Sequence, residues 1–197
     1  MKSLTFKKAL VITGLLSLFA LRGHTATAPQ LVIIIDDIGH SLPLGQRAAT
    51  LPGPINIAVL PHQKNSTVLA ELAYQQGQDV LLHAPMSNVR GKDPGKGALT
   101  AAMSKGEFIS TLNHNLQAIP HVQGVNNHMG SLLTTHRTAM EWVMDVMAER
   151  SLFFVDSLTD SKSVAHVVAS ERQIRTVTRD VFLDNVKTQS AINKQFE

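Results

Sequence analysis

The chain has 197 residues, a length typical of one domain. It contains no cysteine, which excludes disulfide bonds and thiolate metal sites, so any metal must be held by histidine, aspartate, glutamate or water. The chain carries 18 basic and 15 acidic residues, but four of the basic residues lie within the first 28, which hold no acid. The remainder is therefore close to neutral and has no basic stripe with interleaved aromatic residues, which argues against a nucleic-acid partner.

Residues 1–28 have the pattern of a secretory signal peptide. Lys2, Lys7 and Lys8 form a basic start, residues 9–21 form an apolar run too short to span a bilayer comfortably, and residues 26–28 (ATA) offer a small-residue cleavage site. We therefore predict an exported, periplasmic protein with a single domain over residues 29–197. Proline directly after the cleavage site is awkward for a signal peptidase, so an uncleaved membrane anchor is the alternative; no other stable membrane span is expected.

Apolar runs and helical patterns alternate along the rest of the chain. Residues 31–35 are rich in β-branched side chains and predict a buried strand. Further strands are predicted at 55–59, 80–82, 124–126, 153–155 and 175–178, with a short extension at 181–183. Helices are predicted between them, at 42–50, 66–76, 104–118, 135–150 and 164–173. Repeated βα units imply a parallel sheet, either doubly wound or closed into a barrel.

Two local signals refine this pattern. Ser104 followed by Glu107 is a capping-box pattern that predicts the start of the third helix. Residues 88–97 (NVRGKDPGKG) form a polar, glycine-rich loop after the third strand. This loop is a candidate lid or substrate-contact loop, and a solvated surface excursion is the ordinary alternative.

Polar residues follow four of the predicted strands. Asp36 and Asp37 end the first strand, His83 ends the third, His128 follows the fourth and Asp156 ends the fifth. The carboxyl ends of parallel strands lie at one edge of a sheet, where ligands bind, so these side chains are expected to share one face. Singly, an aspartate here can be a helix cap or a turn residue, and a histidine can be a packed structural residue. Their joint placement favours a functional site.

Two adjacent carboxylates repel each other unless a cation or a shared proton relieves them. Two imidazoles and one carboxylate form a three-ligand metal site with open positions for water and substrate. Zinc suits such a site best, and cobalt, nickel, manganese or iron are compatible with it. The remaining carboxylate can then act as a base towards water.

Five motifs resemble a known family in their order and spacing: LVIIIDDIG, LLHAPM, GVNNHMGS, FFVDSLT and RDVFLDN. They resemble the divergent polysaccharide deacetylases, the YibQ-like branch of the NodB-homology superfamily, over about residues 30–197. The resemblance implies an α/β fold, a distorted (β/α) barrel of about seven strands. Relatives continue through another helix and strand, and in the superfamily a late histidine serves as general acid. We therefore expect a barrel that is incomplete at its C-terminus.

The resemblance also implies roles for individual residues. Asp36 matches the catalytic base of the superfamily, and Asp37 matches its metal-binding aspartate. His83 lies where the superfamily places its first metal histidine, but Ser87 occupies the place of the second, four residues later. His128 is the candidate replacement, so the expected ligands are Asp37, His83 and His128. Substrate binding is assigned to Asn127, Asp156, Ser157 and Asp184.

By analogy with carbohydrate esterase family 4, the resemblance implies metal-dependent removal of acetyl groups from an envelope polysaccharide or peptidoglycan-type glycan. The first alternative is a non-catalytic periplasmic glycan-binding protein that retains the deacetylase fold, because the second superfamily histidine is missing. A metal-dependent hydrolase of another bond, such as a phosphoester, is the third hypothesis. The near-neutral charge and the lack of a glycine-rich phosphate loop argue against it.

Overall fold

A computed structural model describes residues 31–196, so the predicted signal peptide lies outside the described residues. Six strands form one sheet in which every neighbouring pair is parallel, and the strands pair in their chain order. The strands are β1 (Ile33–Ile38), β2 (Ile55–Val59), β3 (Asp79–Met86), β4 (Val122–Met129), β5 (Phe153–Asp156) and β6 (Thr176–Thr178). All their carboxyl ends therefore lie at one rim of the sheet.

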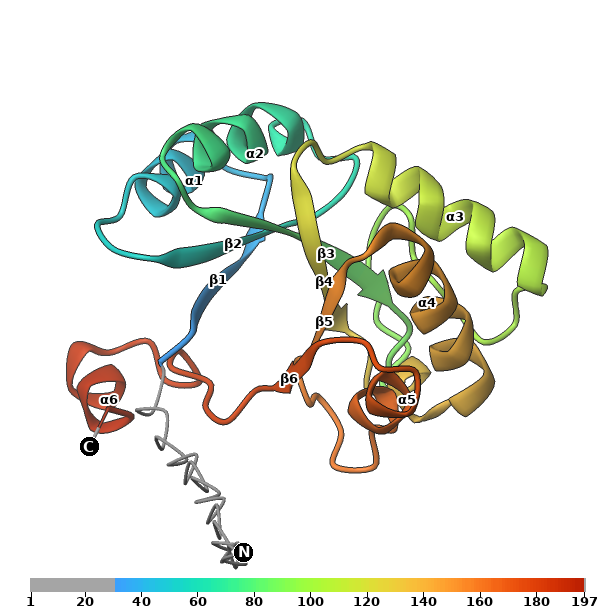
Figure 1. The fold of residues 1–197 in the computed structure, drawn as a ribbon. Helices are drawn as coiled ribbons and strands as arrows, with labels where there is room; N and C mark the ends of the chain where they lie inside the picture. The colour runs from blue at the N-terminus through green and yellow to red at the C-terminus, as the bar shows by residue number, and fades with distance from the viewer. Residues whose placement is uncertain (1–30, 197) are drawn as a thin grey trace, which may run out of the picture. The chain divides into compact units, whose positions relative to one another are not determined.

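A helix connects each strand to the next. The helices are α1 (Leu42–Ala49), α2 (Ser66–Gln75), α3 (Lys105–Gln117), α4 (Arg137–Arg150), α5 (Ala165–Glu171) and α6 (Gln189–Lys194), with a 3₁₀ turn, η1, at Leu133–Thr135. Figure 1 shows α1 to α5 following one another around the outer side of the curved sheet. Within residues 31–196, none of the helices combines the length and apolarity needed to cross a membrane.

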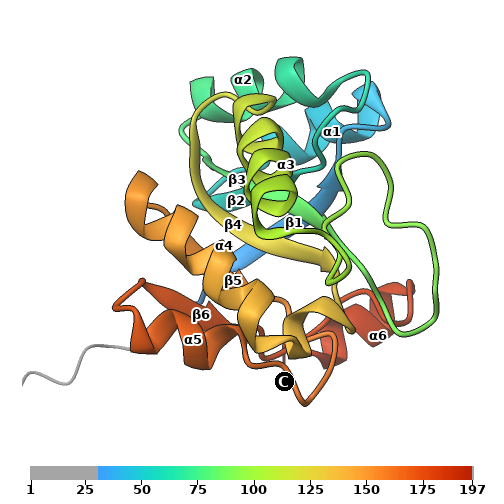
Figure 2. The same ribbon diagram turned by 90° about the vertical axis from the view of Figure 1, so that its right-hand side faces the viewer.

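The sheet curls into a half-barrel, which Figure 2 shows from a second side. Strands β1 and β6 are its two edges, and they do not pair with each other in the part of the chain that the structure describes. The predicted α/β fold with an incomplete barrel is confirmed.

Strand residues alternate between the outer and the inner side of the half-barrel. On the outer side, apolar side chains pack against the helices in one large core, including Ile57, Val59, Val80, Leu82, Val125 and Phe154. On the inner side, a small separate cluster is formed by Ile34, Ala58, Leu81, Phe153 and Val155. Because side chains alternate with a period of two, the inward residues nearer the carboxyl rim of β1, β3 and β4 are polar. These residues are Asp36, His83, Asn126 and His128.

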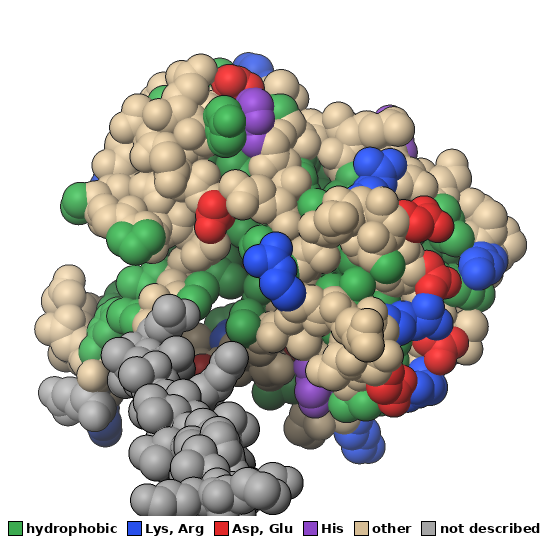
Figure 3. Space-filling view, viewed as in Figure 1, with side chains coloured by type: hydrophobic (Ala, Val, Ile, Leu, Met, Phe, Trp, Pro, Cys, Tyr) green, Lys and Arg blue, Asp and Glu red, His purple; other side chains and the backbone are tan. Residues whose placement is uncertain are grey.

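Charged and apolar side chains also gather on different parts of the molecular surface. In Figure 3, charged side chains of both signs are scattered over the side formed by α3, α4 and α5, whereas apolar side chains lie in the hollow over β1. Ion pairs join the three helices, from Lys105 and Arg172 to Asp145 and from Arg137 to Glu171.

Local signals decide where the elements begin and end. Ser104 caps α3 as predicted, since its hydroxyl accepts a hydrogen bond from Glu107 N at 3.3 Å. His136 caps α4 by accepting from Ala139 N, so this helix begins two residues later than predicted. The predicted strand extension at 181–183 is wrong. The segment lies beyond the sheet edge formed by β6 and has no neighbouring strand to pair with among the described residues.

Candidate metal centre

A bulge at the end of β1 brings two adjacent carboxylates to one place. The parallel register between β1 and β2 shifts between Ile35 and Ile38, and Asp37 has a left-handed backbone with φ of 57°. In a regular strand, neighbouring side chains point to opposite faces, so only one of the two aspartates would face inwards. Here both carboxylates lie beside His83, with Asp36 Oδ2 at 3.8 Å and Asp37 Oδ1 at 3.3 Å from its Nε2 atom.

Three donor atoms from three strands converge at this bulge. Asp37 Oδ1 lies 2.9 Å from His128 Nδ1 and 3.3 Å from His83 Nε2, and the two histidine nitrogens are 3.1 Å apart. Ligand atoms about 2.0–2.1 Å from a tetrahedral zinc ion are separated from one another by about 3.3 Å. The three donor atoms are therefore spaced as ligands of one small divalent cation, with the fourth position open.

A neighbour on β4 orients the His83 ring. His83 is buried, and its Nδ1 atom lies 2.9 Å from Asn126 Oδ1. Donation of the Nδ1 proton to this oxygen leaves the lone pair of Nε2 directed at the two carboxylates. That arrangement is repulsive unless a cation or a second ring proton lies between the groups. The residue set therefore fits a divalent metal.

The two aspartates differ in their proton affinity. In the metal-free site, the ring nitrogens of His128 and His83 that face Asp37 hold the pKa of its carboxyl well below the usual range, so this carboxylate stays ionised and suits a ligand. Burial raises the pKa of Asp36; the nearby His83 opposes this rise, and the Asp37 and Asp184 carboxylates add to it. A carboxylate with a raised pKa accepts a proton more readily, so Asp36 suits a general base.

Two cavities flank the three converging residues, and both are lined by Asp37 and His128. We name the first the loop cavity; its volume is about 290 Å³, and it is completed by His40, Leu60, Gln63, Asp93, Pro94 and Gly95. We name the second the β5 cavity; its volume is about 200 Å³, and it also contains Asp36 and His83. The β5 cavity is completed by Asn127, Met129, Ser157, Thr159, Phe182 and Asp184. Each cavity is open to solvent beside the candidate metal ligands.

The glycine-rich loop at 88–97 contributes one wall of the loop cavity. Asn88 organises this loop, because its side chain accepts hydrogen bonds from Arg90 N and Lys92 N and donates one to Lys92 O. Asp93 and Gly95 form a turn at the tip, with Gly95 N donating to Asp93 Oδ1 at 2.8 Å. These hydrogen bonds give the loop at 88–97 a fixed conformation beside the candidate metal ligands.

Asn127 and Ser157, both predicted to bind substrate, lie in the wall of the β5 cavity. The Asn127 side chain donates to Met129 O at 2.7 Å and accepts from Ser157 N at 2.9 Å, so it joins the ends of β4 and β5. Both of its polar groups are thereby engaged with backbone. The placement gives Asn127 a positioning role in the cavity wall.

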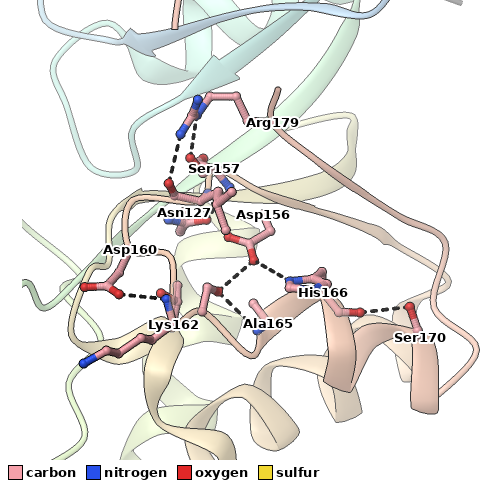
Figure 4. Close-up of polar contacts among 12 residues, drawn as sticks. Asn127, Asp156, Ser157, Asp160, Lys162, Ala165, His166, Ser170 and Arg179 are labelled. Carbon is pink, nitrogen blue, oxygen red and sulfur yellow. Dashed lines mark hydrogen bonds and ion pairs between the residues drawn. The ribbon is translucent and has the colours of Figure 1, made fainter. Parts of the chain in front are cut away.

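Asp156 faces away from the cavity, on the helix side of β5. Its carboxylate is fully buried and accepts hydrogen bonds from Leu158 N at 2.9 Å and Ser163 Oγ at 2.7 Å, with His166 Nδ1 at 3.3 Å (Figure 4). The period of two explains this direction, since Phe153 and Val155 face inwards. Asp156 therefore fastens β5 to α5, and its position is not open to substrate.

Asp184 lies at the rim on the loop after β6, and an arginine anchors this loop. The Arg179 guanidinium donates to Ser157 O at 2.7 Å and Leu158 O at 2.9 Å (Figure 4), and its Cζ atom lies 3.6 Å from the Phe182 ring centroid. Burial lowers the pKa of Arg179, against the opposing effect of the Asp156 carboxylate. This anchor holds Phe182 and Asp184 against the β5 cavity.

Three residues of this region were not singled out from the sequence: Asn126, Arg179 and Phe182. The signal for Asn126 was available, because it lies two residues before His128 in one strand and therefore shares its face. No local pattern marks Arg179 or Phe182, since their roles depend on contacts with β5.

Comparison with known proteins identifies the family. The model of the divergent polysaccharide deacetylases matches residues 33–197. The chain belongs to the divergent polysaccharide deacetylase family. This confirms the resemblance that the five motifs indicated.

Relatives and a solved structure support the assignment. The chain is 33% identical over 168 residues to an uncharacterized protein of Haemophilus influenzae, covering 85% of this chain and 60% of the relative. It is 31% identical over 169 residues to the uncharacterized protein YibQ of Escherichia coli, covering 86% and 53%. A crystal structure of an uncharacterized protein from Agrobacterium tumefaciens has the same fold, with a TM-score of 0.78, 24% identity, and coverage of 84% of this chain and 68% of that one. The chain thus spans somewhat more than half the length of the two sequence relatives.

Proposed function

We propose that the protein is a metal-dependent hydrolase that removes acetyl groups from an envelope polysaccharide in the periplasm. The observation that carries the proposal is the convergence of Asp37, His83 and His128 on one point beside a second carboxylate, Asp36. Membership of the family supports an acetylated glycan as substrate. The signal-peptide pattern of residues 1–28 supports export.

The three converging residues would hold a divalent cation, with zinc the best match to two imidazoles and a carboxylate. When bound, such a cation polarises the acetyl carbonyl and makes water a stronger nucleophile at neutral pH. Asn126 keeps His83 in the tautomer that a metal requires, and the bulge at Asp37 presents its carboxylate to the same point.

Asp36 would take the proton from the attacking water. Its carboxylate is about half exposed to the β5 cavity and lies just outside the group of three donor atoms, at 3.8 Å from His83 Nε2. In the metal-free protein, burial raises the pKa of Asp36 above that of an ordinary aspartate, which is the direction that a general base requires. Burial and the neighbouring carboxylates thus prepare Asp36 to accept a proton beside the substrate.

The walls of the two cavities would hold the sugar. Phe182 offers an aromatic ring and Asp184 a carboxylate in the β5 cavity, and the loop cavity offers Gln63 and Asp93. An apolar ring with a few polar groups is the usual composition of a small-ligand site. Arg179 and Asn127 hold the wall in place by their backbone contacts.

The decisive experiment measures metal content and acetate release together. We expect the mature protein to bind one zinc ion, and the His83→Ala/His128→Ala variant to lose it together with acetate release from acetylated glycans. His136→Asn is the matched control, because it removes an imidazole that lines neither cavity and leaves a good helix cap. A folded wild-type protein that binds no divalent metal would contradict the proposal.

A glycan-binding protein without catalysis is the second candidate. Ser87 stands where the superfamily has its second metal histidine, and its hydroxyl is buried without a hydrogen-bond partner. Binding of acetylated glycan that persists in Asp36→Ala and in the presence of chelator, without acetate release by the wild type, would favour this candidate over the hydrolase.

A further inference from the structure

A fully buried asparagine lies near the end of α3. Asn115 has no exposed surface, and the other buried residues of this helix, Phe108, Leu112 and Leu116, are apolar. A buried amide group is unfavourable unless both its oxygen and its nitrogen are hydrogen-bonded. The partners of the Asn115 side chain therefore indicate what this polar residue does in an apolar layer.

The Asn115 side chain joins two loops from different parts of the chain. Its Nδ2 atom donates to Gly97 O at 2.8 Å, at the end of the glycine-rich loop. Its Oδ1 atom lies 2.9 Å from His62 Nε2, in the loop after β2. Because this oxygen can only accept, His62 Nε2 carries a proton and donates it. Both polar groups of the asparagine are thus engaged, and neither partner belongs to α3.

The two joined residues adjoin two walls of the loop cavity. His62 precedes Gln63, which lines this cavity from the loop after β2. Gly97 lies two residues after Gly95, which lines it from the glycine-rich loop. One buried side chain therefore holds both loops through hydrogen bonds of 2.9 and 2.8 Å. We call Asn115 with these two hydrogen bonds the loop clamp.

The glycine-rich loop depends on the loop clamp for its attachment to α3. Figure 2 shows the loop projecting from the fold between β3 and α3. In the part of the chain that the structure describes, the hydrogen bonds of residues 90–95 stay within the loop. Gly97 has a φ of 77°, and a Cβ atom there would lie 2.1 Å from Asn115 Oδ1, so only glycine permits this contact.

We propose that Asn115 is a positioning residue that sets the width of the loop cavity and thereby the affinity of the site for a glycan chain. The inference rests on the deacetylase function proposed above, and it assigns the loop cavity to the sugar next to the acetylated one. Asp37 and His128 line both cavities, so an acetyl group beside them leaves the loop cavity free for a neighbouring sugar. Its volume of about 290 Å³ is near the lower end of the usual range for small-ligand sites, which suits one sugar ring.

Loss of the loop clamp should act on binding and not on the chemical step. Neither Asn115 nor Gly97 is among the residues that line the two cavities, so neither touches the reacting atoms. A released loop has to be ordered again when a sugar binds, and this ordering lowers the affinity. A substrate that presents an acetyl group without a sugar does not need the loop. The effect should therefore appear in KM for a glycan and leave kcat unchanged.

The test moves the loop away from Asn115 without changing α3. Gly97→Ala places a methyl group against Asn115 Oδ1, whereas Gly91→Ala places one in open space within the same loop. Both glycines have positive φ, 77° and 62°, and each follows a basic residue, so the two variants share backbone strain and differ at the loop clamp. Asn115→Ala removes the same contact from the helix side, with Asn113→Ala on the same helix as its control. Gly97→Ala and Asn115→Ala are the two clamp variants.

The first measurement needs no substrate. Trypsin can cut the loop after three basic residues, Arg90, Lys92 and Lys96, and cleavage requires local opening of the chain. Loss of one neutral hydrogen bond should raise the rate of cleavage in the loop by about tenfold in the clamp variants. Cleavage of Gly91→Ala measures the effect of backbone strain alone, and mass spectrometry identifies the bonds that are cut.

The second measurement uses the zinc-loaded full chain and two substrates. An N-acetylglucosamine trimer presents an acetyl group with neighbouring sugars, whereas nitrophenyl acetate presents one without a sugar. We expect the clamp variants to raise KM for the trimer by about tenfold relative to Gly91→Ala and Asn113→Ala, with kcat and hydrolysis of the aryl ester unchanged. Bound zinc should equal that of the wild type, because the loop clamp contains none of the candidate ligands.

The possible outcomes are distinct. Equal cleavage of the loop in Gly97→Ala and Gly91→Ala would overturn the loop clamp. Faster cleavage of the loop without a change in KM for the trimer, or with equal losses on both substrates, would overturn its role in glycan affinity and leave the deacetylase function intact. A wild type that cleaves neither substrate would overturn the deacetylase function and the role in glycan affinity with it, and the trypsin result would still decide whether Asn115 holds the loop.

Discussion

The helix-covered outer face of the sheet and its carboxyl rim are built by different rules. The outer face is a continuous apolar core in which strand residues such as Val80, Leu82 and Phe154 pack against regular helices. The rim is polar, and several of its residues have left-handed backbone, among them Asp37, Met129 and Leu158 with φ of 57°, 55° and 43°. Such a conformation costs about 1 kcal/mol or more for each non-glycine residue.

Side-chain hydrogen bonds hold the rim in this conformation. Met129 O accepts from both Asn127 Nδ2 and Thr159 Oγ1, and Leu158 O accepts from Arg179. The comparison teaches that this fold separates stability from function. The apolar side chains buried on the outer face stabilise the fold. At the rim, polar contacts hold left-handed residues and adjacent carboxylates, which are themselves unfavourable for folding.

Truncation of the outer core should have the largest effect on stability. Phe154 is fully buried between the sheet and the helices, so Phe154→Ala should lower the free energy of unfolding by about 3–5 kcal/mol. Urea unfolding measures the change. Val177→Ala, at a half-exposed position on the edge strand, is the control and should change little. Equal effects of the two substitutions would contradict the packing described for β5.

Removing the proposed base should separate activity from stability. Asp36→Asn should lower kcat by about 10²–10⁴-fold while zinc is retained. In the wild type, the rate should rise with pH as Asp36 loses its proton, and this limb of the pH profile should be absent in Asp36→Asn. An unchanged rate and pH profile in Asp36→Asn would exclude this residue as the base.

The raised pKa of Asp36 predicts the sign of a stability change in the metal-free protein. A group whose pKa is raised by folding stabilises the fold below its unfolded pKa, and that stability is lost as the pH rises through the folded pKa. Metal-free Asp36→Asn should therefore be more stable than the wild type at neutral pH, and the difference should shrink as the pH falls. Thermal unfolding of both proteins at about pH 4 to 8, a range that starts near the pKa of an ordinary carboxyl, measures this difference.

Loss of the rim anchor should have a smaller but measurable effect. Arg179→Met keeps an unbranched stem but removes two charged donors from the partly buried Ser157 and Leu158 carbonyls, which should cost about 1.5–3 kcal/mol. Because the anchored loop carries Phe182 and Asp184, KM for glycan should also rise. A stability loss without a change in KM would show that the loop does not contribute to the substrate site.

The smallest effect is expected at the ion pairs between the outer helices. Arg172 pairs with Asp145 on the surface, and both side chains are about one-third exposed. Arg172→Gln should lower the free energy of unfolding by about 0.2–1 kcal/mol, and high salt should reduce the difference. If Arg172→Gln lost as much free energy of unfolding as Arg179→Met, the ion pairs on the outer surface would contribute as much to stability as the rim anchor does, contrary to this prediction.

Much of the fold followed from local patterns. Strand β2 has the predicted bounds 55–59, and Ser104 caps α3 as expected, because apolar alternation and capping depend on neighbouring residues. The prediction that polar residues after the strands would gather at one rim also led to Asp37, His83 and His128, which the structure brings together. The predicted strand at 181–183 was wrong, since strand formation requires a partner and not only β-branched residues.

The sequence by itself determined the alternation of strands and helices, the parallel sheet and the polar composition of its carboxyl rim, because each follows from residue type and spacing. The tertiary structure decided which polar groups meet. The bulge that turns Asp36 and Asp37 to the same side requires a register shift against β2, and the direction of Asp156 towards α5 follows from its place in β5. The placement of Arg179 and Phe182 also depends on contacts between segments far apart in the chain. Such contacts have no local signature, because their energies arise only when the strands have paired.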